Sequence, residues 1–383
     1  MALHFDKLDF DGRLLRARRA IADRGLDAML LFAQESMYWL TGYDSFGYCF
    51  FQCLVLRGDG TMVLLTRAPD LRQAQHTSIL GDIRIWVDDG AASPAQQLCD
   101  LVLELGLMDK QIGVEYDTHG LTAANGRAVD ATFSSIVRLV DASDLMPRLR
   151  AVKSPKEIDY ARKAGILADA ALFAGLGEIA AGAHEAEILA AMQGAVLKGG
   201  GDYPANEFII GSGPDALLCR YKSGRRRLSE QDQITLEFAG VWRHYHAALM
   251  RTVVVGAPMP RHHEFHNVCV KALAAVEDAM RPGSTFGEVF EAHARVMDDA
   301  GLAAHRLNAC GYSLGARFSP SWMDWPMFYR GNRTEIVPDM ILFAHMIVMD
   351  SDSGTAMCLG QTYLTTAGAP EPLSAASLDL QVR

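Results

Sequence analysis

The chain has 383 residues, of which 50% are hydrophobic and 21% charged, and acidic side chains outnumber basic ones, giving a net charge of −10. This balance argues against a nucleic-acid partner, and the composition excludes disordered and collagen-like chains. No apolar run reaches the roughly 18 residues of a membrane span, and the first residues lack the form of a signal peptide. We therefore expect a cytoplasmic protein with no membrane partner.

The seven cysteines are widely spaced and include no Cys-x-x-Cys pair. Scattered cysteines in apolar surroundings are typical of reduced core thiols, and a zinc site built from cysteines requires paired spacing. The sequence thus predicts neither a disulfide framework nor a cysteine-built metal site.

The first part of the chain alternates helix and strand patterns. Residues 58–60 (Gly-Asp-Gly) separate two apolar runs and indicate a hairpin. The predicted elements are a helix at 11–23, strands at 28–33, 53–56, 62–65 and 83–87, a helix at 94–105 and a strand at 112–115. This alternation predicts an α/β domain over residues 1–147.

A turn-rich stretch at 141–147 precedes a helix start in which Ser154 is the N-cap, a proline follows, and Glu157 completes a capping box. The predicted helices lie at 158–178, 185–197, 264–280 and 286–300, and the predicted strands near 208–211, 234–239, 248–255 and 341–349. This predicts a second domain over residues 148–383 and an α+β class for the whole chain.

Glu237 is the first chemical anomaly, because it lies inside the apolar run 234–240. A strand that is buried on both faces normally carries apolar side chains, so a carboxylate there must be paired, bound to a metal or functional. The alternative to a functional role is a salt bridge to a structural arginine.

Two histidines, His244 and His246, follow in the run 242–252. If this strand is regular, both histidines project to one face, and Arg243 and Tyr245 project to the other. Side chains satisfied by backbone groups are the alternative to a role in catalysis or binding.

His345 is the second anomaly, since it is the polar residue of an apolar run at 341–349. A satisfied core histidine is the usual explanation. Tyr312, in the glycine-flanked run 311–315, belongs to the same predicted domain. Its presence there favours a functional role for His345.

Several motifs resemble one superfamily. Residues 37–42 (Met-Tyr-Trp-Leu-Thr-Gly) resemble a signature of the amino domain of prolidases, aminopeptidase P and creatinase. Residues 150–158, 251–256, 311–315 and 338–343 resemble segments of the "pita-bread" domain of the M24 superfamily. The resemblance implies a creatinase-type α/β amino-terminal domain followed by a pita-bread catalytic domain.

The resemblance also implies where the metal ligands of the metallopeptidases would lie. When the family pattern is aligned with this chain, the ligand positions fall on Glu237, Ala248, Tyr312, His345 and a position near Gly360. Alanine and glycine offer no side-chain donor, and two divalent ions need several oxygen ligands. We therefore expect no metal and no other cofactor, which argues against an active Xaa-Pro peptidase.

The metal-free branch that the motifs resemble is that of ectoine hydrolase. Residues 236–240, 245–252, 311–315 and 345–347 are similar to its pattern, whereas residues 356–360 lack a late glutamate of that enzyme. The resemblance implies a small-molecule substrate that contains an amidine, guanidino or amide C–N bond. The alternatives are an Xaa-Pro peptidase-like protein and a catalytically degenerate binding module.

Roles for the site residues follow from this interpretation. Glu237 would bind a cationic substrate and act as proton shuttle or nucleophile, His246 or His345 would supply acid/base catalysis near neutral pH, and Tyr312 would donate to the developing tetrahedral centre. The substrate-binding candidates are Arg220, Tyr221, His244 and Arg251.

The resemblance further implies a homodimer, in which the amino domain of one subunit covers the site of the other. The segment 43–51 is rich in aromatic residues and would be an aggregation hazard if it were exposed. Packing of this segment within its own domain is the alternative.

Overall fold

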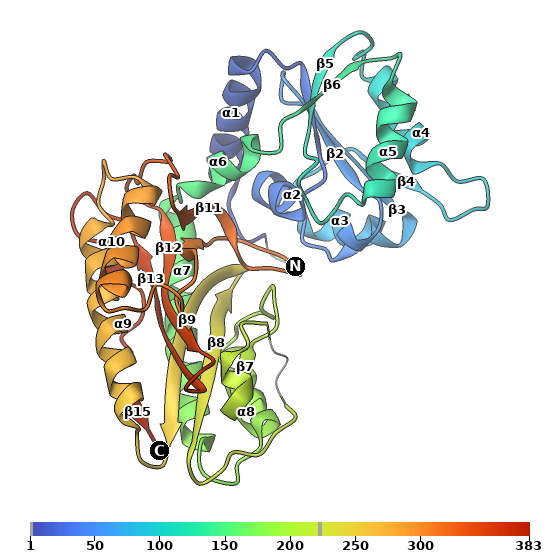
Figure 1. The fold of residues 1–383 in the computed structure, drawn as a ribbon. Coiled ribbons are helices and arrows are strands. Elements are labelled where there is room, and N and C mark those ends of the chain that lie inside the picture. The colour runs from blue at the N-terminus through green and yellow to red at the C-terminus, as the bar shows by residue number, and fades with distance from the viewer. Residues whose placement is uncertain (1–2, 221–223) are drawn as a thin grey trace. The chain divides into compact units, whose positions relative to one another are not determined.

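The computed structural model describes residues 3–220 and 224–383, and the chain divides into two compact units, Met1–Arg150 and Ala151–Arg383 (Figure 1). Both units have the predicted class, an α/β amino-terminal unit and an α+β carboxy-terminal unit. Tyr221, a candidate for substrate binding, lies outside the described residues.

The amino-terminal unit is built on a mixed sheet with the strand order β4-β3-β2-β1-β5-β6. Its strands are β1 (Ala28–Leu31), β2 (Cys53–Arg57), β3 (Met62–Arg67), β4 (Ile83–Trp86), β5 (Gln111–Val114) and β6 (Arg138–Asp141). The predicted hairpin joins β2 and β3 in antiparallel register, and β1 pairs in parallel with β5. The parallel pairs require the helical crossovers that the alternating pattern predicted.

Helices cover both faces of this sheet. Alternate strand residues point to opposite sides, and the apolar residues on each side pack against these helices. Leu30 and Val55 pack with α4 and α5, whereas Met29 and Leu31 pack with α1 and α2. The helices of the unit are α1 (Lys7–Asp23), α2 (Gln34–Thr41), α3 (Leu71–Thr77), α4 (Pro94–Glu104), α5 (Ala123–Phe133) and α6 (Leu145–Ala151), with 3-10 turns η1 (Gly47–Cys49) and η2 (Ala68–Asp70).

The carboxy-terminal unit is built on a large sheet whose main path runs β11-β10-β12-β13-β9-β8-β7, with neighbouring strands antiparallel. The short strands β14 and β15 pair with β13 and β9. The strands are β7 (Ile209–Ser212), β8 (Asp232–Trp242), β9 (Tyr245–Val255), β10 (Ala309–Ser313), β11 (Asp324–Tyr329), β12 (Ile341–Asp350), β13 (Thr355–Leu364), β14 (Glu371–Pro372) and β15 (Gln381–Val382).

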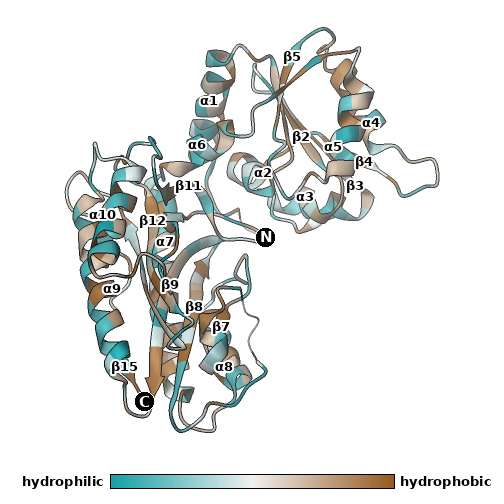
Figure 2. Ribbon diagram, viewed as in Figure 1, coloured by the Kyte–Doolittle hydropathy of each residue, from teal (hydrophilic) through white to brown (hydrophobic). Residues whose placement is uncertain are grey.

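Long helices pack on one face of this sheet: α7 (Pro155–Glu178), α8 (Glu185–Lys198), α9 (Pro260–Ala279) and α10 (Phe286–Asp299). Gly240 of β8 allows α7 to approach closely, since a Cβ atom there would lie 2.0 Å from the carbonyl oxygen of Ala164. Leu342, Ala344 and Met346 of β12 share a core with α9 and α10, which run side by side in Figure 1. Figure 2 shows brown, apolar stretches along β9 and teal, hydrophilic stretches on α9.

The predicted capping box at the start of α7 is confirmed, as the Ser154 hydroxyl accepts from Glu157 N and the Glu157 carboxylate accepts from Ser154 N. The strand prediction was incomplete, because it missed β6, β10, β11 and β13 and the short strands β14 and β15. β13 contains small and polar residues, among them Gly360 and Gln361, which interrupt the apolar pattern of a strand. In the described part of the chain, no helix combines the length and apolar character that crossing a membrane requires.

Candidate functional site

Sheet register brings Glu237 and His345 to the same face. Glu237 of β8 lies opposite Met250 of β9, Met250 pairs with Gly360 of β13, and Gly360 lies opposite His345 of β12. Directly opposed residues in antiparallel strands project to the same side. The two polar anomalies of the sequence are therefore separated by only Met250 and Gly360 on one surface of the sheet.

The same face carries the other positions that the family pattern reached. Ala248 is two residues from Met250 on β9, Phe343 is two residues from His345 on β12, and Tyr312 of β10 lies opposite Phe343. Alternation along each strand places all of them with Glu237. We call this surface the Glu237 face; the residues of β12 that pack with α9 and α10 lie on the other face.

Glu237 is buried, with 8% of its surface exposed, and its carboxylate oxygen Oε1 accepts a hydrogen bond from the Tyr312 hydroxyl at 3.5 Å. Burial raises the pKa of Glu237 to about 7, while the charge of Arg220 and the Tyr312 hydrogen bond oppose the rise. Burial disfavours the ionised carboxylate, and a nearby cation favours it. Glu237 is thus poised to gain or lose a proton near neutral pH.

Trp322 fixes the direction in which Tyr312 donates. The indole Nε1 of Trp322 donates to the Tyr312 hydroxyl oxygen at 2.9 Å. An indole N–H is a donor only, so the Tyr312 hydroxyl accepts from Trp322 and keeps its own proton for Glu237. Sequence reasoning missed Trp322, because it lies in an irregular loop without a periodic pattern.

His345 lies in a cluster of three rings. The ring centroids of Tyr312, Phe343 and His345 are 5.5 to 5.7 Å apart. Burial lowers the pKa of His345 to about 3, and its Nδ1 has no hydrogen-bond partner among the described residues. His345 is therefore a neutral imidazole at pH 7, and a buried nitrogen without a partner is available to a bound ligand.

Arg220 is exposed and belongs to the segment between β7 and β8. Its positive charge lowers the pKa of Glu237 and also that of Tyr312. In both residues burial has the larger, opposite effect and raises the pKa. The structure thus brings the predicted substrate-binding Arg220 within electrostatic reach of Glu237.

His246 lies on the Glu237 face but has its ring nitrogens occupied. Nε2 accepts a hydrogen bond from the backbone N–H of Ala205 at 2.9 Å, which leaves the proton on Nδ1, 3.4 Å from the carbonyl oxygen of Gly315. Burial lowers the pKa of His246 to about 3. The structure therefore supports the alternative of a histidine satisfied by backbone groups, and it gives titration near pH 7 to Glu237 instead of to either histidine.

His244 does not lie in a strand. Arg243 and His244 have φ values of 52° and 65° and form the tight turn between β8 and β9, so the regular strand that would have paired His244 with His246 is interrupted. Two positive φ angles are the requirement of a type I′ hairpin turn. The His244 ring stacks on Phe318 at 4.2 Å, and the structure does not bring it to Glu237.

Arg251 lies on the opposite face from Glu237. It pairs with Leu236 and Leu359, so its side chain projects away from the Glu237 face. Its Nη1 donates to the Gly360 carbonyl oxygen at 2.7 Å, and burial lowers its pKa to about 10. The structure thus does not place Arg251 where it could bind a substrate held by Glu237, nor where it could be the salt-bridge partner of Glu237.

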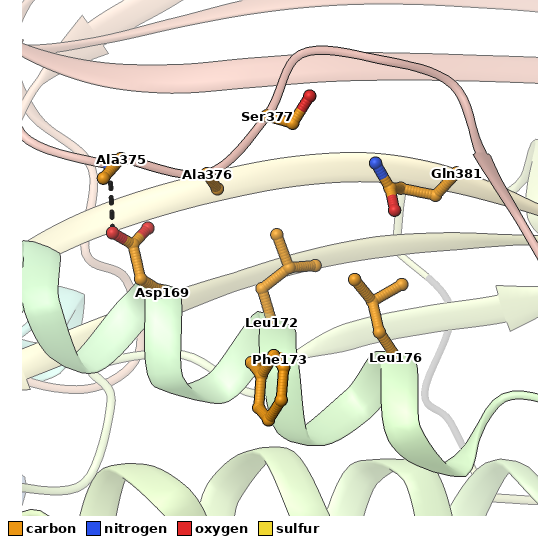
Figure 3. A pocket seen from close by; sticks show the side chains of 8 residues that line it. All are labelled: Asp169, Leu172, Phe173, Leu176, Ala375, Ala376, Ser377 and Gln381. Atoms are coloured by element: carbon orange, nitrogen blue, oxygen red, sulfur yellow. Dashed lines mark hydrogen bonds between the residues drawn. The ribbon is translucent and has the colours of Figure 1, made fainter.

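A cavity of about 370 Å³ lies on the helix-covered side of the sheet, between α7 and the segment after β14 (Figure 3). Leucine and phenylalanine side chains of α7 form one wall, and Ala375 N donates to the Asp169 carboxylate at its rim. Its lining residues are Asp169, Leu172, Phe173, Leu176, Ala375, Ala376, Ser377 and Gln381. This cavity is separate from the Glu237 face.

The Glu237 face does not fit a pair of divalent metal ions. Ala248 and Gly360 have no donor atoms, and a Cβ atom on Gly360 would lie 2.8 Å from the Phe343 ring. Among the described residues, no three His, Cys, Asp or Glu side chains are grouped to hold a metal ion. The Phe343 ring therefore lies where a side chain at position 360 would begin.

The fold and the motifs place the chain in a known class. It belongs to metallopeptidase family M24, whose pattern matches residues 159–367. The creatinase/prolidase N-terminal domain matches residues 13–152. The family resemblance predicted from the motifs is confirmed.

Individual relatives fall into two groups. The chain is 26% identical over 364 residues to an ectoine hydrolase of Halomonas elongata, with 90% of each chain covered. It is 24% identical to a Xaa-Pro dipeptidase of Pyrococcus furiosus, over 55% of this chain and 59% of that one. The structure of a prolidase from Thermococcus sibiricus superposes with a TM-score of 0.88 over 99% of this chain and all of that one, at 17% identity, which shows the fold.

The carboxyl of Glu237 is expected to titrate near pH 7. Its protonated C=O absorption in difference infrared spectra against Glu237→Gln should persist at pH 6 and disappear above pH 8, because burial raises the pKa. In Arg220→Gln the absorption should persist to higher pH, since a cation that favours the carboxylate is lost. Loss of the absorption already near pH 4.5 would show that the carboxyl is not desolvated.

Proposed function

We propose that this M24-family hydrolase acts without a metal and cleaves a C–N bond in a small amidine, guanidino or amide compound, in the manner of its ectoine hydrolase relative. The observation that carries the proposal is the buried carboxylate of Glu237, which has one hydrogen bond, from Tyr312, and lies in no group of metal-binding side chains as far as the structure describes the chain. A site with one carboxylate suits an organic cation better than two metal ions, which need several anionic ligands.

The chemistry supports this choice of substrate. An amidinium group is already cationic and has an electrophilic carbon, so it needs no Lewis acid to polarise it. The Glu237 carboxylate supplies the counter-charge that the buried site otherwise lacks. Binding of the cation favours ionisation of Glu237, so substrate and catalytic base are activated together.

Two routes balance for the bond cleavage. In one, ionised Glu237 takes a proton from water as the water oxygen bonds to the amidine carbon, and that proton passes to the departing nitrogen as the C–N bond breaks. In the other, the carboxylate oxygen bonds to the amidine carbon, the C–N bond breaks and the departing nitrogen takes a proton from water; hydrolysis then releases the imidoyl group (an acyl group for an amide substrate) and restores the Glu237 carboxylate. Appearance of ¹⁸O in Glu237 after a single turnover in H₂¹⁸O identifies the second route, because the first route forms no bond to the carboxyl group; a covalent adduct on Glu237 in acid-quenched enzyme identifies it where water attacks the substrate carbon instead.

The neighbouring groups have roles that match their hydrogen bonds. Tyr312, oriented by Trp322, would donate to the oxygen that develops at the attacked carbon. Neutral His345 would use its unpartnered Nδ1 to hold a polar group of the substrate. Arg220, at the exposed side of the site, would bind a substrate carboxylate.

Replacing Glu237 by glutamine should lower kcat/KM by about 10²-fold or more, which is the range for loss of a positioned acid/base group. The substitution keeps the shape of the side chain and removes its charge, so the fold should persist. The measurement is hydrolysis of ectoine, creatine and Xaa-Pro dipeptides in parallel assays, with circular dichroism as the check on folding.

Glu157→Gln is a matched control for this substitution. Glu157 is also buried in the carboxy-terminal unit, where it accepts from the Tyr245 hydroxyl at 2.7 Å. The Glu157→Gln substitution should lower thermal stability and change kcat/KM less than Glu237→Gln does. Equal turnover by parent and Glu237→Gln, or cleavage of the dipeptides alone, would refute the proposed role of Glu237.

The purified protein is expected to contain no stoichiometric transition metal, because two of the family's ligand positions are Ala248 and Gly360. Elemental analysis should give far less than one Mn, Co or Zn per chain, and chelators should leave the rate unchanged. About two metal ions per chain, lost together with activity on chelation, would contradict the metal-free proposal.

We also propose a homodimer. Within the amino-terminal unit, Tyr43, Tyr48 and Phe51 are buried, as packing in the same domain requires, but Phe46 is 74% and Phe50 46% exposed. Exposed aromatic side chains close together favour an interface. Light scattering should give twice the chain mass of 41.8 kDa, and a value near one chain mass would reject the dimer.

A further inference from the structure

Glu185 is a fully buried carboxylate at the first position of α8. A buried ionised group is costly unless hydrogen bonds or charges compensate it. The helix N-terminus favours negative charge, but it does not explain why the side chain turns toward the sheet. The hydrogen bonds of the Glu185 carboxylate explain this direction.

Five donors converge on this carboxylate. Oε1 accepts from the backbone N–H of Ser212 at 3.0 Å and from its hydroxyl at 2.6 Å. Oε2 accepts from three successive backbone N–H groups, those of Gly224, Arg225 and Arg226, at 3.2 to 3.3 Å. Hydrogen bonds of N–H and O–H donors to a carboxylate are stronger than bonds between neutral groups.

The two sets of donors lie at opposite ends of one segment of the chain. Ser212 is the last residue of β7, and residues 224–226 lead toward β8. Arg226 reinforces the junction, as its Nη1 donates to the Ser212 hydroxyl at 2.9 Å and its carbonyl oxygen accepts from Glu185 N. Glu185 therefore joins both ends of the segment that carries Arg220.

This segment is also attached to the strand that holds Glu237. The 3-10 turn η3 (Gly213–Leu217) follows Ser212, and the Thr235 hydroxyl of β8 donates to the Ala216 carbonyl oxygen at 3.2 Å. Thr235 and Glu237 project to the same face. The hydrogen bonds of Glu185 and of η3 thus fix where the segment leaves the sheet after β7 and where it rejoins the sheet before β8.

We propose that Glu185 is a positioning residue, which keeps Arg220 within electrostatic reach of Glu237 by joining the two ends of the segment between β7 and β8. The proposal rests on the proposed function in assigning Arg220 to the binding of a substrate carboxylate. The hydrogen bonds of Glu185 do not depend on that function, so they are tested separately.

The first measurement is limited proteolysis of the full-length protein with trypsin. Cleavage at Arg220 and at residues 225–227 should be faster in Glu185→Ala and Glu185→Gln by about tenfold or more, because loss of the charged acceptor leaves several donors unsatisfied. Glu115→Gln is the control, since Glu115 of the amino-terminal unit is a buried carboxylate that also accepts from backbone N–H groups. It should leave cleavage at these arginines unchanged.

The second measurement is a double-mutant cycle on activity. Glu185→Gln should raise KM about tenfold or more with a smaller change in kcat, and should shift the acidic limb of the kcat/KM profile to higher pH, and Arg220→Gln should do the same. Combining the two substitutions should add little to Arg220→Gln alone. Thermal unfolding identifies a variant that does not fold, and Ser212→Ala, which removes one donor, then serves in its place.

The outcomes separate the two claims. Unchanged tryptic cleavage in folded Glu185 variants overturns the positioning role. Faster cleavage with unchanged kinetics in both Glu185→Gln and Arg220→Gln shows that the segment is held by Glu185 but that Arg220 does not bind substrate, which contradicts the proposed function at that residue. Fully additive losses in the double variant overturn action through Arg220.

Discussion

Burial of the Glu237 carboxylate in a central strand is the constraint on which the site depends. Ionisation there is opposed by lost hydration, and the Tyr312 hydrogen bond and the charge of Arg220 only partly offset this cost, so the pKa rises to about 7. The long strands β8, β9, β12 and β13 set this environment, since their register places His345 on the same face and leaves the other face to the helices. The chemistry of the site is therefore determined by sheet pairing between segments more than a hundred residues apart.

The same register shows how the Glu237 face departs from the ligand pattern of the family's metallopeptidases. The face still has the positions that the family pattern uses, but Ala248 and Gly360 carry no ligand, and the ring of Phe343 fills the space beside Gly360. A pair of divalent ions needs several anionic oxygens, whereas a single carboxylate matches the charge of one organic cation. The fold thus keeps the location of these positions, while two of them have no side chain that could bind a metal ion.

Local signals in the sequence predicted much of this architecture. The capping box before α7 and the apolar periodicity of the long helices are local features, and Glu237 stood out because a carboxylate is rare in an apolar run. Features that depend on partners were missed or misjudged. The positive φ angles at Arg243 and His244 interrupt the expected strand, the face on which Arg251 lies follows from pairing, and Trp322 reaches Tyr312 only through the tertiary fold.

Hydrogen bonding, and not pKa, distinguishes Glu237 from the other buried carboxylates Glu115 and Glu185. Burial raises the pKa of Glu115 to about 7, the same as that of Glu237. Glu115, however, accepts from the backbone N–H groups of Phe32 and Ala33 and from the Ser36 hydroxyl, and Glu185 accepts from five donors. Among the described residues, Glu237 has the single Tyr312 hydrogen bond at 3.5 Å. No other donor in the described part of the chain reaches this carboxylate, so a cation or a water molecule bound on the Glu237 face would meet an oxygen atom that is still able to bind it.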